Sequence, residues 1–461
     1  MDKVAKTARK WGGGELAAFS ICAGCLLCGT SALATVSYTY ENDNKTYVAT
    51  VTSAETAISQ EAINVLDSNA ITNFVVNGTA RLVVDKSSTF TGDVYAFAPL
   101  RLSAANSLGV GPGKIFVTTN KVTTSGGTVD KEIVFECLDK WGEQSGIGMW
   151  GGYGTATFKK KVTFTAGGLN IYPYVNSRLV FEGGLEGPGC LAIREARGGT
   201  IVFTNTPIRL THNYPGSAKD DGVGDTTGFS RHYVFAVAGN DLSRFAHPDY
   251  PFSIGELKTT VDWAFNKSNM YMHFGHDSRW DLCGTEQRVG QFDVKVTTGN
   301  PSVVTNSSEK TATLRLGMMY GPSSSAPNIR FGGNLSVVFE KNIWTTIIDH
   351  AMTATGDLTI EGNGGGGATS AILRFTENGS WANSTNVTVN GVGKITIANP
   401  NALGRKANVN LASNSSLEIA SGVTVNVRTL KVGGVEKLPG DYTFGSGTLH
   451  VSPSGFQMRV R

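Results

Sequence analysis

Short segments of alternating apolar and polar residues recur along this chain at a spacing close to 22 residues. Leu169-Asn170-Ile171 is followed at that spacing by Leu191-Ala192-Ile193, and Leu179-Val180-Phe181 by Ile201-Val202-Phe203. Similar spacings toward the C-terminus relate Leu373 and Ile395, Val387 and Val409, Ile395 and Leu417, Val409 and Leu430, and Leu314, Leu335 and Leu358. A repeat of this length, whose units bury apolar side chains only by stacking, is typical of solenoids.

The alternation within each segment has the period of two that is expected of strands with one buried face. Gly, Asn, Ser and Pro separate the segments and supply the turns between them. We therefore predict an all-β chain folded as a parallel β-helix, with coils of about 22 residues. A β-sandwich is the alternative, but it has no reason to keep a constant long register.

The composition agrees with a turn-rich β protein. Gly accounts for 57 of the 461 residues, and only 17% of the residues are charged. So few charges exclude disorder that is driven by charge repulsion. The abundance of Gly, Ser, Thr, Asn and Val excludes long helices and coiled coils.

The N-terminus has the pattern of a secretory signal peptide. Four basic residues precede an apolar run that ends in Ala32-Leu33-Ala34, a small-x-small cleavage site. We expect the mature chain to begin after residue 34, with no later segment long and apolar enough to span a bilayer. A transmembrane anchor and lipidation at Cys25, within Ala23-Gly24-Cys25, are the alternatives.

Cleavage would remove four basic and two acidic residues, which leaves a chain close to neutral. That balance gives no indication of a nucleic-acid partner. The remaining cysteines, Cys137, Cys190 and Cys283, have no zinc-binding spacing. Both one disulfide with a spare thiol and three buried thiols fit the sequence.

The pattern also divides the chain into expected segments. These are a signal peptide over 1–34, an N-terminal cap with the first coils over 35–95, solenoid over 96–206, an irregular insertion over 207–270, solenoid over 271–422, and a C-terminal capping segment over 423–461. Ser59 to Leu66 is predicted to be a short helix. Caps are expected because open solenoid ends invite pairing with other chains.

Several motifs resemble those of a known family. The stretch Trp280 to Gly290, followed by 304–308 and 312–316, resembles the autotransporter-associated β-strand repeat, with Cys283 where that repeat usually has Asn. Two turns and a terminal segment are similar to further parts of that family: Asn106-Ser107-Leu108-Gly109, Asn401-Ala402-Leu403-Gly404, and Leu430 to Val451.

The resemblance implies a right-handed β-helix of the pectin-lyase type, exported by a Gram-negative-type bacterium and displayed at its surface, with no catalytic residues. The ten residues after Val451 leave no room for an outer-membrane barrel, so display would need a separate outer-membrane exporter. Residence in the periplasm is the alternative.

An enzyme is the competing hypothesis, because polysaccharide lyases and hydrolases resemble this core geometry. Its site would lie beside the expected insertion, where Asp220-Asp221 is found, and Gly275-His276-Asp277 also resembles part of the polygalacturonase pattern. That pattern also contains an Asn-x-Asp triplet and an Arg-x-Lys pair in a fixed order, and this chain lacks them in that order. We therefore interpret Asp220-Asp221 as a solvated acidic turn.

Two further groups of residues were candidates for binding. His273 and His276 would face opposite sides of a strand, which argues against a shared metal ion. Five aromatic residues lie close together in the sequence and would either stack on sugar rings or pack in turns and in the core: Trp141, Trp150, Tyr153, Tyr172 and Tyr174.

The sequence thus predicts no catalytic, cofactor-binding or metal-ligating residue and no cofactor. We expect a secreted or cell-surface structural or adhesive module that acts by multivalent display, with a surface glycan or a host or neighbouring cell as partner. A polysaccharide-active enzyme and a passive spacer are the alternatives.

Overall fold

The computed structural model describes most of the chain after residue 35. The described ranges are 36–118, 121–136, 146–149, 154–165, 168–174, 176–188, 190–193, 198–210, 223–225, 231–242, 244–245, 252, 254–265, 270–294, 300–320, 329–340, 345–362 and 372–453. The predicted signal peptide therefore lies outside the described residues.

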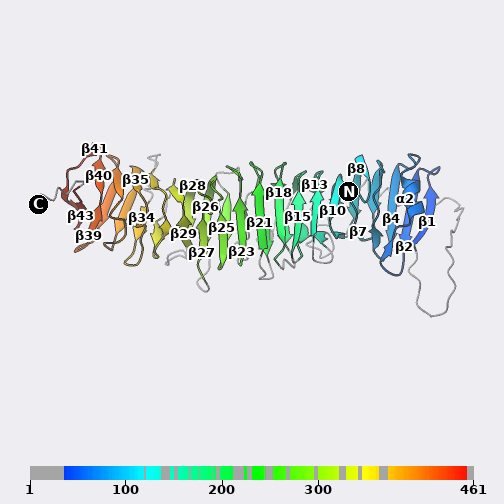
Figure 1. Cartoon of the computed structure of the whole chain (residues 1–461), viewed down its shortest axis with the longest axis horizontal. Helices are drawn as coiled ribbons and strands as arrows, with labels where there is room; N and C mark the ends of the chain where they lie inside the picture. The colour runs from blue at the N-terminus through cyan, green and yellow to red at the C-terminus, as the bar shows by residue number, and fades with distance from the viewer. Residues whose placement is uncertain are drawn as a thin grey trace, which may run out of the picture.

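The chain is an elongated β-solenoid of about 14 parallel turns, in the form of a right-handed parallel β-helix (Figure 1). The N-terminal coils, in blue, lie at one end of the rod and the C-terminal coils, in red, at the other. The fold predicted from the 22-residue repeat is confirmed. Each strand pairs with its counterpart in the next coil, so the backbone groups of one coil are satisfied by its neighbours.

The first sheet runs from the N-terminal end past the middle of the rod. Its strands are β1 (Val36–Glu41), β2 (Thr46–Val51), β4 (Asn73–Gly78), β6 (Asp93–Ala96), β8 (Val110–Thr118), β10 (Gly127–Glu136), β12 (Gly154–Phe158), β13 (Val162–Phe164), β15 (Ser177–Phe181), β16 (Leu185–Gly187), β18 (Thr200–Thr204), β19 (Arg209–Leu210), β21 (Arg231–Ala236), β23 (Gly255–Thr259), β25 (Ser278–Asp281), β27 (Ser302–Thr305), β29 (Ile329–Gly333) and β32 (Thr353–Ala354).

A second sheet covers another side of the N-terminal half. Its strands are β3 (Thr56–Ala57), β5 (Leu82–Val84), β7 (Leu100–Leu102), β9 (Lys121–Thr124), β11 (Gly146–Met149), β14 (Gly168–Tyr172), β17 (Cys190–Ile193) and β20 (Val223–Asp225).

Three further sheets lie in the C-terminal half. The longest holds β22 (Arg244–Phe245), β24 (Tyr271–Phe274), β26 (Glu286–Val294), β28 (Ala312–Tyr320), β30 (Leu335–Phe339), β33 (Leu358–Gly362), β35 (Asn386–Gly391), β37 (Asn408–Leu411), β40 (Thr429–Val432) and β41 (Val435–Glu436). The others hold β31 (Thr345–Ile348), β34 (Ile372–Phe375), β36 (Lys394–Ile397) and β38 (Ser416–Ile419), and β39 (Thr424–Val427), β42 (Gly440–Phe444) and β43 (Gly447–Val451).

Most of the predicted register is reproduced residue by residue. Leu169 pairs with Leu191 and Leu179 with Ile201. The same holds for the pairs Leu373 and Ile395, Val387 and Val409, Ile395 and Leu417, and Val409 and Leu430.

The predicted alignment of Leu314, Leu335 and Leu358 is wrong at Leu335, because Val337 is the residue that pairs with both Leu314 and Leu358. Leu314 pairs with Val337, and Leu335 with Ala312. The shift is two residues, which keeps every apolar side chain on the inner face. The repeat therefore fixed the inward face there but not the partner.

Aromatic side chains stack along the interior of the middle coils. Phe158, Phe181, Phe203 and Phe235 occupy the same inward position in four successive strands, with neighbouring ring centroids 5.1, 5.7 and 5.0 Å apart. Each ring is almost completely buried. Burial of an aromatic ring contributes on the order of 1.5 to 3 kcal/mol, so this stack is a large part of the local stability.

Buried amide side chains hold the turns of successive coils together. Asn306 donates hydrogen bonds to the carbonyls of Lys310 and Asn334 at 2.7 Å and accepts one from the amide of Gly284 at 2.8 Å. Asn240, which is fully buried, bridges three backbone groups in the same manner. These contacts satisfy backbone groups at corners where no strand partner is present.

The stretch 207–270 differs from the irregular insertion that we expected. Its described residues include β21 and β23, which continue the stack: Thr200 pairs with His232, His232 with Glu256, and Glu256 with Arg279. The coil between Thr200 and His232 is longer than its neighbours. Because of this extra length, a search for residues at a fixed spacing does not detect the register here. Most of the extra residues lie outside the described part.

The two ends of the rod differ from its middle. At the N-terminal end β1 pairs antiparallel with β2, and the predicted short helix is confirmed as α2 (Gln60–Leu66), where Ser59 accepts a hydrogen bond from the amide of Ala62. At the C-terminal end β42 pairs antiparallel with β43. Across the described ranges, no helix has the length and hydropathy of a membrane span.

Candidate functional site

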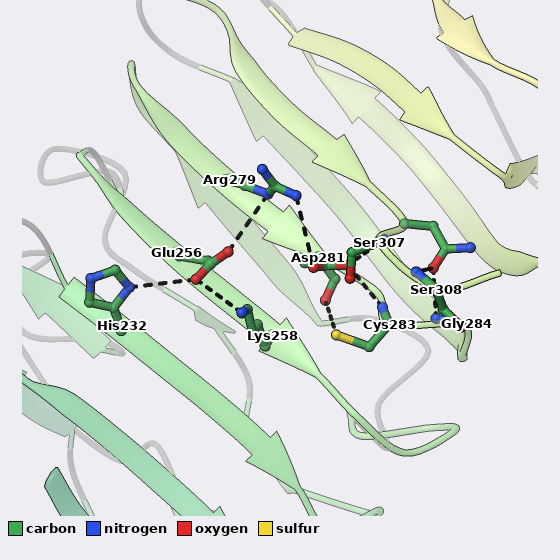
Figure 2. Close-up of polar contacts among 10 residues, drawn as sticks. His232, Glu256, Lys258, Arg279, Asp281, Cys283, Gly284, Ser307 and Ser308 are labelled. Atoms are coloured by element: carbon green, nitrogen blue, oxygen red, sulfur yellow. Dashed lines mark hydrogen bonds and ion pairs between the residues drawn. The ribbon is translucent and has the colours of Figure 1, made fainter. Parts of the chain in front are cut away.

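A group of charged side chains lies on the outward face of three neighbouring strands in the middle of the rod (Figure 2). The charged cluster, as we name it, consists of His232 on β21, Glu256 and Lys258 on β23, and Arg279 and Asp281 on β25. Alternation positions them, because the intervening residues Tyr233, Leu257 and Trp280 are buried inward. Parallel register then brings the outward residues of successive coils side by side.

Glu256 is the centre of this charged cluster. Its carboxylate lies 3.6 Å from Nδ1 of His232, 3.4 Å from Nζ of Lys258 and 3.7 Å from Nε of Arg279. These distances exceed those of close charge-assisted hydrogen bonds. Glu256 and its partners keep between 25% and 50% of their side-chain surface exposed, so each pair contributes at most about 1 kcal/mol to stability.

Asp281 is the one buried member of the charged cluster. Its Oδ1 accepts hydrogen bonds from the amides of Cys283 and Ser307, both at 3.0 Å, and Arg279 lies 3.9 Å from Oδ2. Burial by itself would raise the pKa of Asp281, but these hydrogen bonds, with Arg279, lower it below its ordinary value. The carboxylate therefore stays ionised and holds two turns of successive coils in place.

Cys283 follows in the turn after β25. Its φ of 48° lies in the left-handed region, where Asn is favoured over other non-Gly residues. Burial raises the pKa of its thiol, and the charge of Asp281 adds to the effect. A thiol that stays protonated is a poor nucleophile.

A second ionic group lies on β26 and β28 and just after β30. Nε of Arg288 contacts Glu340 at 2.7 Å, and Arg315 contacts Glu286 at 2.6 Å and Glu340 at 3.4 Å. Two arginines and two glutamates balance one another, and Glu340 is 8% exposed. This group links coils and offers little unpaired charge to a ligand.

Among the residues that the structure describes, one lysine is buried. Lys131 is 1% exposed; its Nζ donates a hydrogen bond to the carbonyl of Gly92 and lies 4.8 Å from the ring centroid of Phe90. Burial lowers its pKa to about 8, against an opposing effect of Asp93. It can therefore lose its proton in mildly basic solution while the chain is folded.

The structure separates the two histidines that the sequence analysis considered together. His273 on β24 is buried, with Nδ1 3.2 Å from Oδ2 of Asp293 on the next coil. His276 lies beyond the strand, with Nδ1 2.8 Å from Oδ2 of Asp277. Each imidazole thus has its own carboxylate partner.

Two of the predicted aromatic candidates are described. The ring of Tyr172 lies against the strand that carries Gly146 and Gly148, because a Cβ at Gly146 would stand 2.9 Å from the ring atom Cε2 of Tyr172. Nζ of Lys121 lies 4.7 Å from the ring centroid. Tyr174 packs against the core. Both rings thus pack against the protein itself.

The other candidates lie outside the described residues. These are Asp220, Asp221, Trp141, Trp150, Tyr153, Cys25 and Cys137. The backbone of Cys190 lies in β17, and Cys283 carries a free thiol.

Sequence reasoning missed the charged cluster. His232, Glu256 and Arg279 recur at spacings of 24 and 23 residues, close to the coil length, so a search for charged residues in step with the coil would have found them. The cluster contains both signs of charge on an exposed surface, and such an arrangement suits recognition of a charged ligand.

Comparison with known proteins adds no relative. No described protein family, no curated protein and no solved structure matches this chain.

Proposed function

We propose that this protein is a secreted or cell-surface structural and adhesive module that acts by multivalent display. The observation that carries the proposal is the stack of about 14 parallel turns, which repeats outward positions at the spacing of one strand, about 4.8 Å. Contacts that are weak at one coil add along such a row because the rigid rod holds them at high effective concentration.

Display further requires export, and the predicted signal peptide over 1–34 supports it. The charged cluster also favours binding over catalysis. Its ion pairs are exposed to a ligand, whereas its one buried carboxylate, that of Asp281, already accepts hydrogen bonds from backbone amides.

The proposal is tested by measuring adhesion of the purified protein, immobilised on beads, to whole cells and to a panel of neutral and acidic polysaccharides. Beads that carry the protein should be retained, and retention should fall steeply when the protein density on the beads is lowered. Retention that is equal to that of uncoated beads would contradict the proposal. Release of reducing or unsaturated ends from a polysaccharide would instead support the enzyme alternative.

A further inference from the structure

One outward position of the first sheet carries a basic residue on every second coil. From Arg178 onward, seven successive coils align at this position: Arg178, Thr200, His232, Glu256, Arg279, Val303 and Arg330, in that order. We call these residues the axial row. The basic side chains occupy its first, third, fifth and seventh places.

The basic members of the axial row are accessible to a ligand. Arg178, Arg279 and Arg330 are exposed, and the side chain of His232 is 40% exposed. Arg178 and Arg330 have no ion pair with any residue that the structure describes, so their guanidinium groups keep their five donors for an incoming anion. The imidazole of His232 has at least one N–H donor in either protonation state.

The distances along the axial row follow from sheet geometry. Neighbouring strands are about 4.8 Å apart, so the basic residues recur at about 9.6 Å. A sugar ring in an extended polysaccharide advances about as far as one coil rises. A glycan laid along the rod would therefore meet one basic residue at every second sugar.

The residues between the basic ones disfavour a polysaccharide that carries an acidic group on every sugar. Thr200 and Val303 are neutral, and Glu256 is anionic. A carboxylate on every sugar would set one of them beside Glu256, where like charges repel. A chain with its acidic group on every second sugar avoids this contact. The acidic groups of such a chain can also bind His232 and Arg279, because these residues lie as far as 3.6 and 3.7 Å from the carboxylate of Glu256.

We propose that the axial row is a binding site for an extended acidic polysaccharide that carries one acidic group on every second sugar. The proposal rests on the adhesive function above and names its ligand class. The charge of the chain, +3 over the full sequence and close to neutral after the expected cleavage, favours such local recognition over general attraction to polyanions.

Binding to immobilised hyaluronan, which has a carboxylate on every second sugar, tests the proposal, with polygalacturonate, dextran and double-stranded DNA as further arms. The triple variant Arg178→Gln/Arg279→Gln/Arg330→Gln should bind hyaluronan about tenfold more weakly, because three exposed ionic contacts are lost. The matched control Arg209→Gln/Arg374→Gln/Arg405→Gln removes the same charge from exposed positions elsewhere and should bind as the parent does.

Two further variants sharpen the test. Arg178→Gln/Arg330→Gln breaks no ion pair of the described structure, so a loss of binding in this variant cannot come from a damaged charged cluster. Glu256→Gln should strengthen binding to polygalacturonate severalfold more than binding to hyaluronan, because it removes the repulsive contact.

The outcomes separate the two proposals. Equal losses in the triple variant and its control, or tighter binding to DNA or polygalacturonate than to hyaluronan by the parent, would overturn the axial row as the site. Adhesion to cells without binding to hyaluronan would overturn this ligand class and leave the adhesive function standing. Absence of both adhesion to cells and binding to hyaluronan would overturn both the adhesive function and the axial row as a binding site.

Discussion

The middle coils and the C-terminal coils stack in the same way but use different side chains to do so. In the middle, phenylalanines stack inside and the charged cluster lies outside. Toward the C-terminus, Val387, Val409 and Leu430 stack inside, and a ladder of hydrogen bonds between polar side chains runs outside.

That outer ladder is made of hydrogen bonds between successive coils. Asn386 donates to Asp357 at 2.7 Å, Asn408 donates to Asn386 at 3.1 Å, and Thr429 donates to Asn408 at 2.9 Å. Like residues can satisfy one another here because the coils keep a spacing of 22 and 21 residues. The middle coils vary in length, and their exterior carries side chains of both charges in place of one repeated polar residue type.

The largest effect is expected from a charge placed inside the regular C-terminal coils. Val389 is fully buried between Ile360 and Leu411, so Val389→Asp should lower the free energy of unfolding by more than about 4 kcal/mol. Thr388→Asp, on the outer face of the same strand, should change it by less than about 0.5 kcal/mol. Urea denaturation measures both, and equal effects would contradict the inward assignment.

Removal of one ring from the aromatic stack should have the next largest effect. Phe203→Ala leaves a cavity between Phe181 and Phe235 and should cost about 3 to 5 kcal/mol. Thr204→Ala, at the partly exposed next position, is the control. If Phe203→Ala unfolds at the same urea concentration as the parent, the stack does not stabilise the middle coils.

The buried lysine should make stability depend on pH. Because the pKa of Lys131 is about 8 when folded and about 10.5 when unfolded, the folded chain binds fewer protons between these values, and stability rises with pH in this window. Relative to Lys131→Met, the parent should gain about 3 kcal/mol between pH 7 and pH 10.5. A pH-independent difference between the two proteins would show that Lys131 titrates normally.

The C-terminal ladder of hydrogen bonds and the charged cluster should differ in their contribution to stability. Asn408→Ala removes two hydrogen bonds from the C-terminal ladder and should cost about 1 kcal/mol. Glu256→Gln weakens only loose, exposed pairs and should cost less than about 0.5 kcal/mol. A larger cost for Glu256→Gln than for Asn408→Ala would reverse the comparison and make the charged cluster a structural element.

Prediction from sequence succeeded where the coil length is constant. From Leu373 to Leu430 the predicted partners are those observed, because a fixed repeat and a period-two pattern together specify register. It failed at Leu335, which pairs two residues away from the expected partner, and over 207–270, where one long coil interrupts the period.

The sequence by itself determined that this protein is a stack of parallel β coils with alternating inward residues, because both properties are local and repeat along the chain. Where the coil length varies, only the tertiary structure decided which residues of successive coils meet. Cross-strand neighbours depend on the length of every intervening turn, and a slip of one residue reverses the face of a whole strand. For that reason the contacts within the charged cluster and the order of the axial row, whose members lie far apart in the sequence, were established from the folded chain.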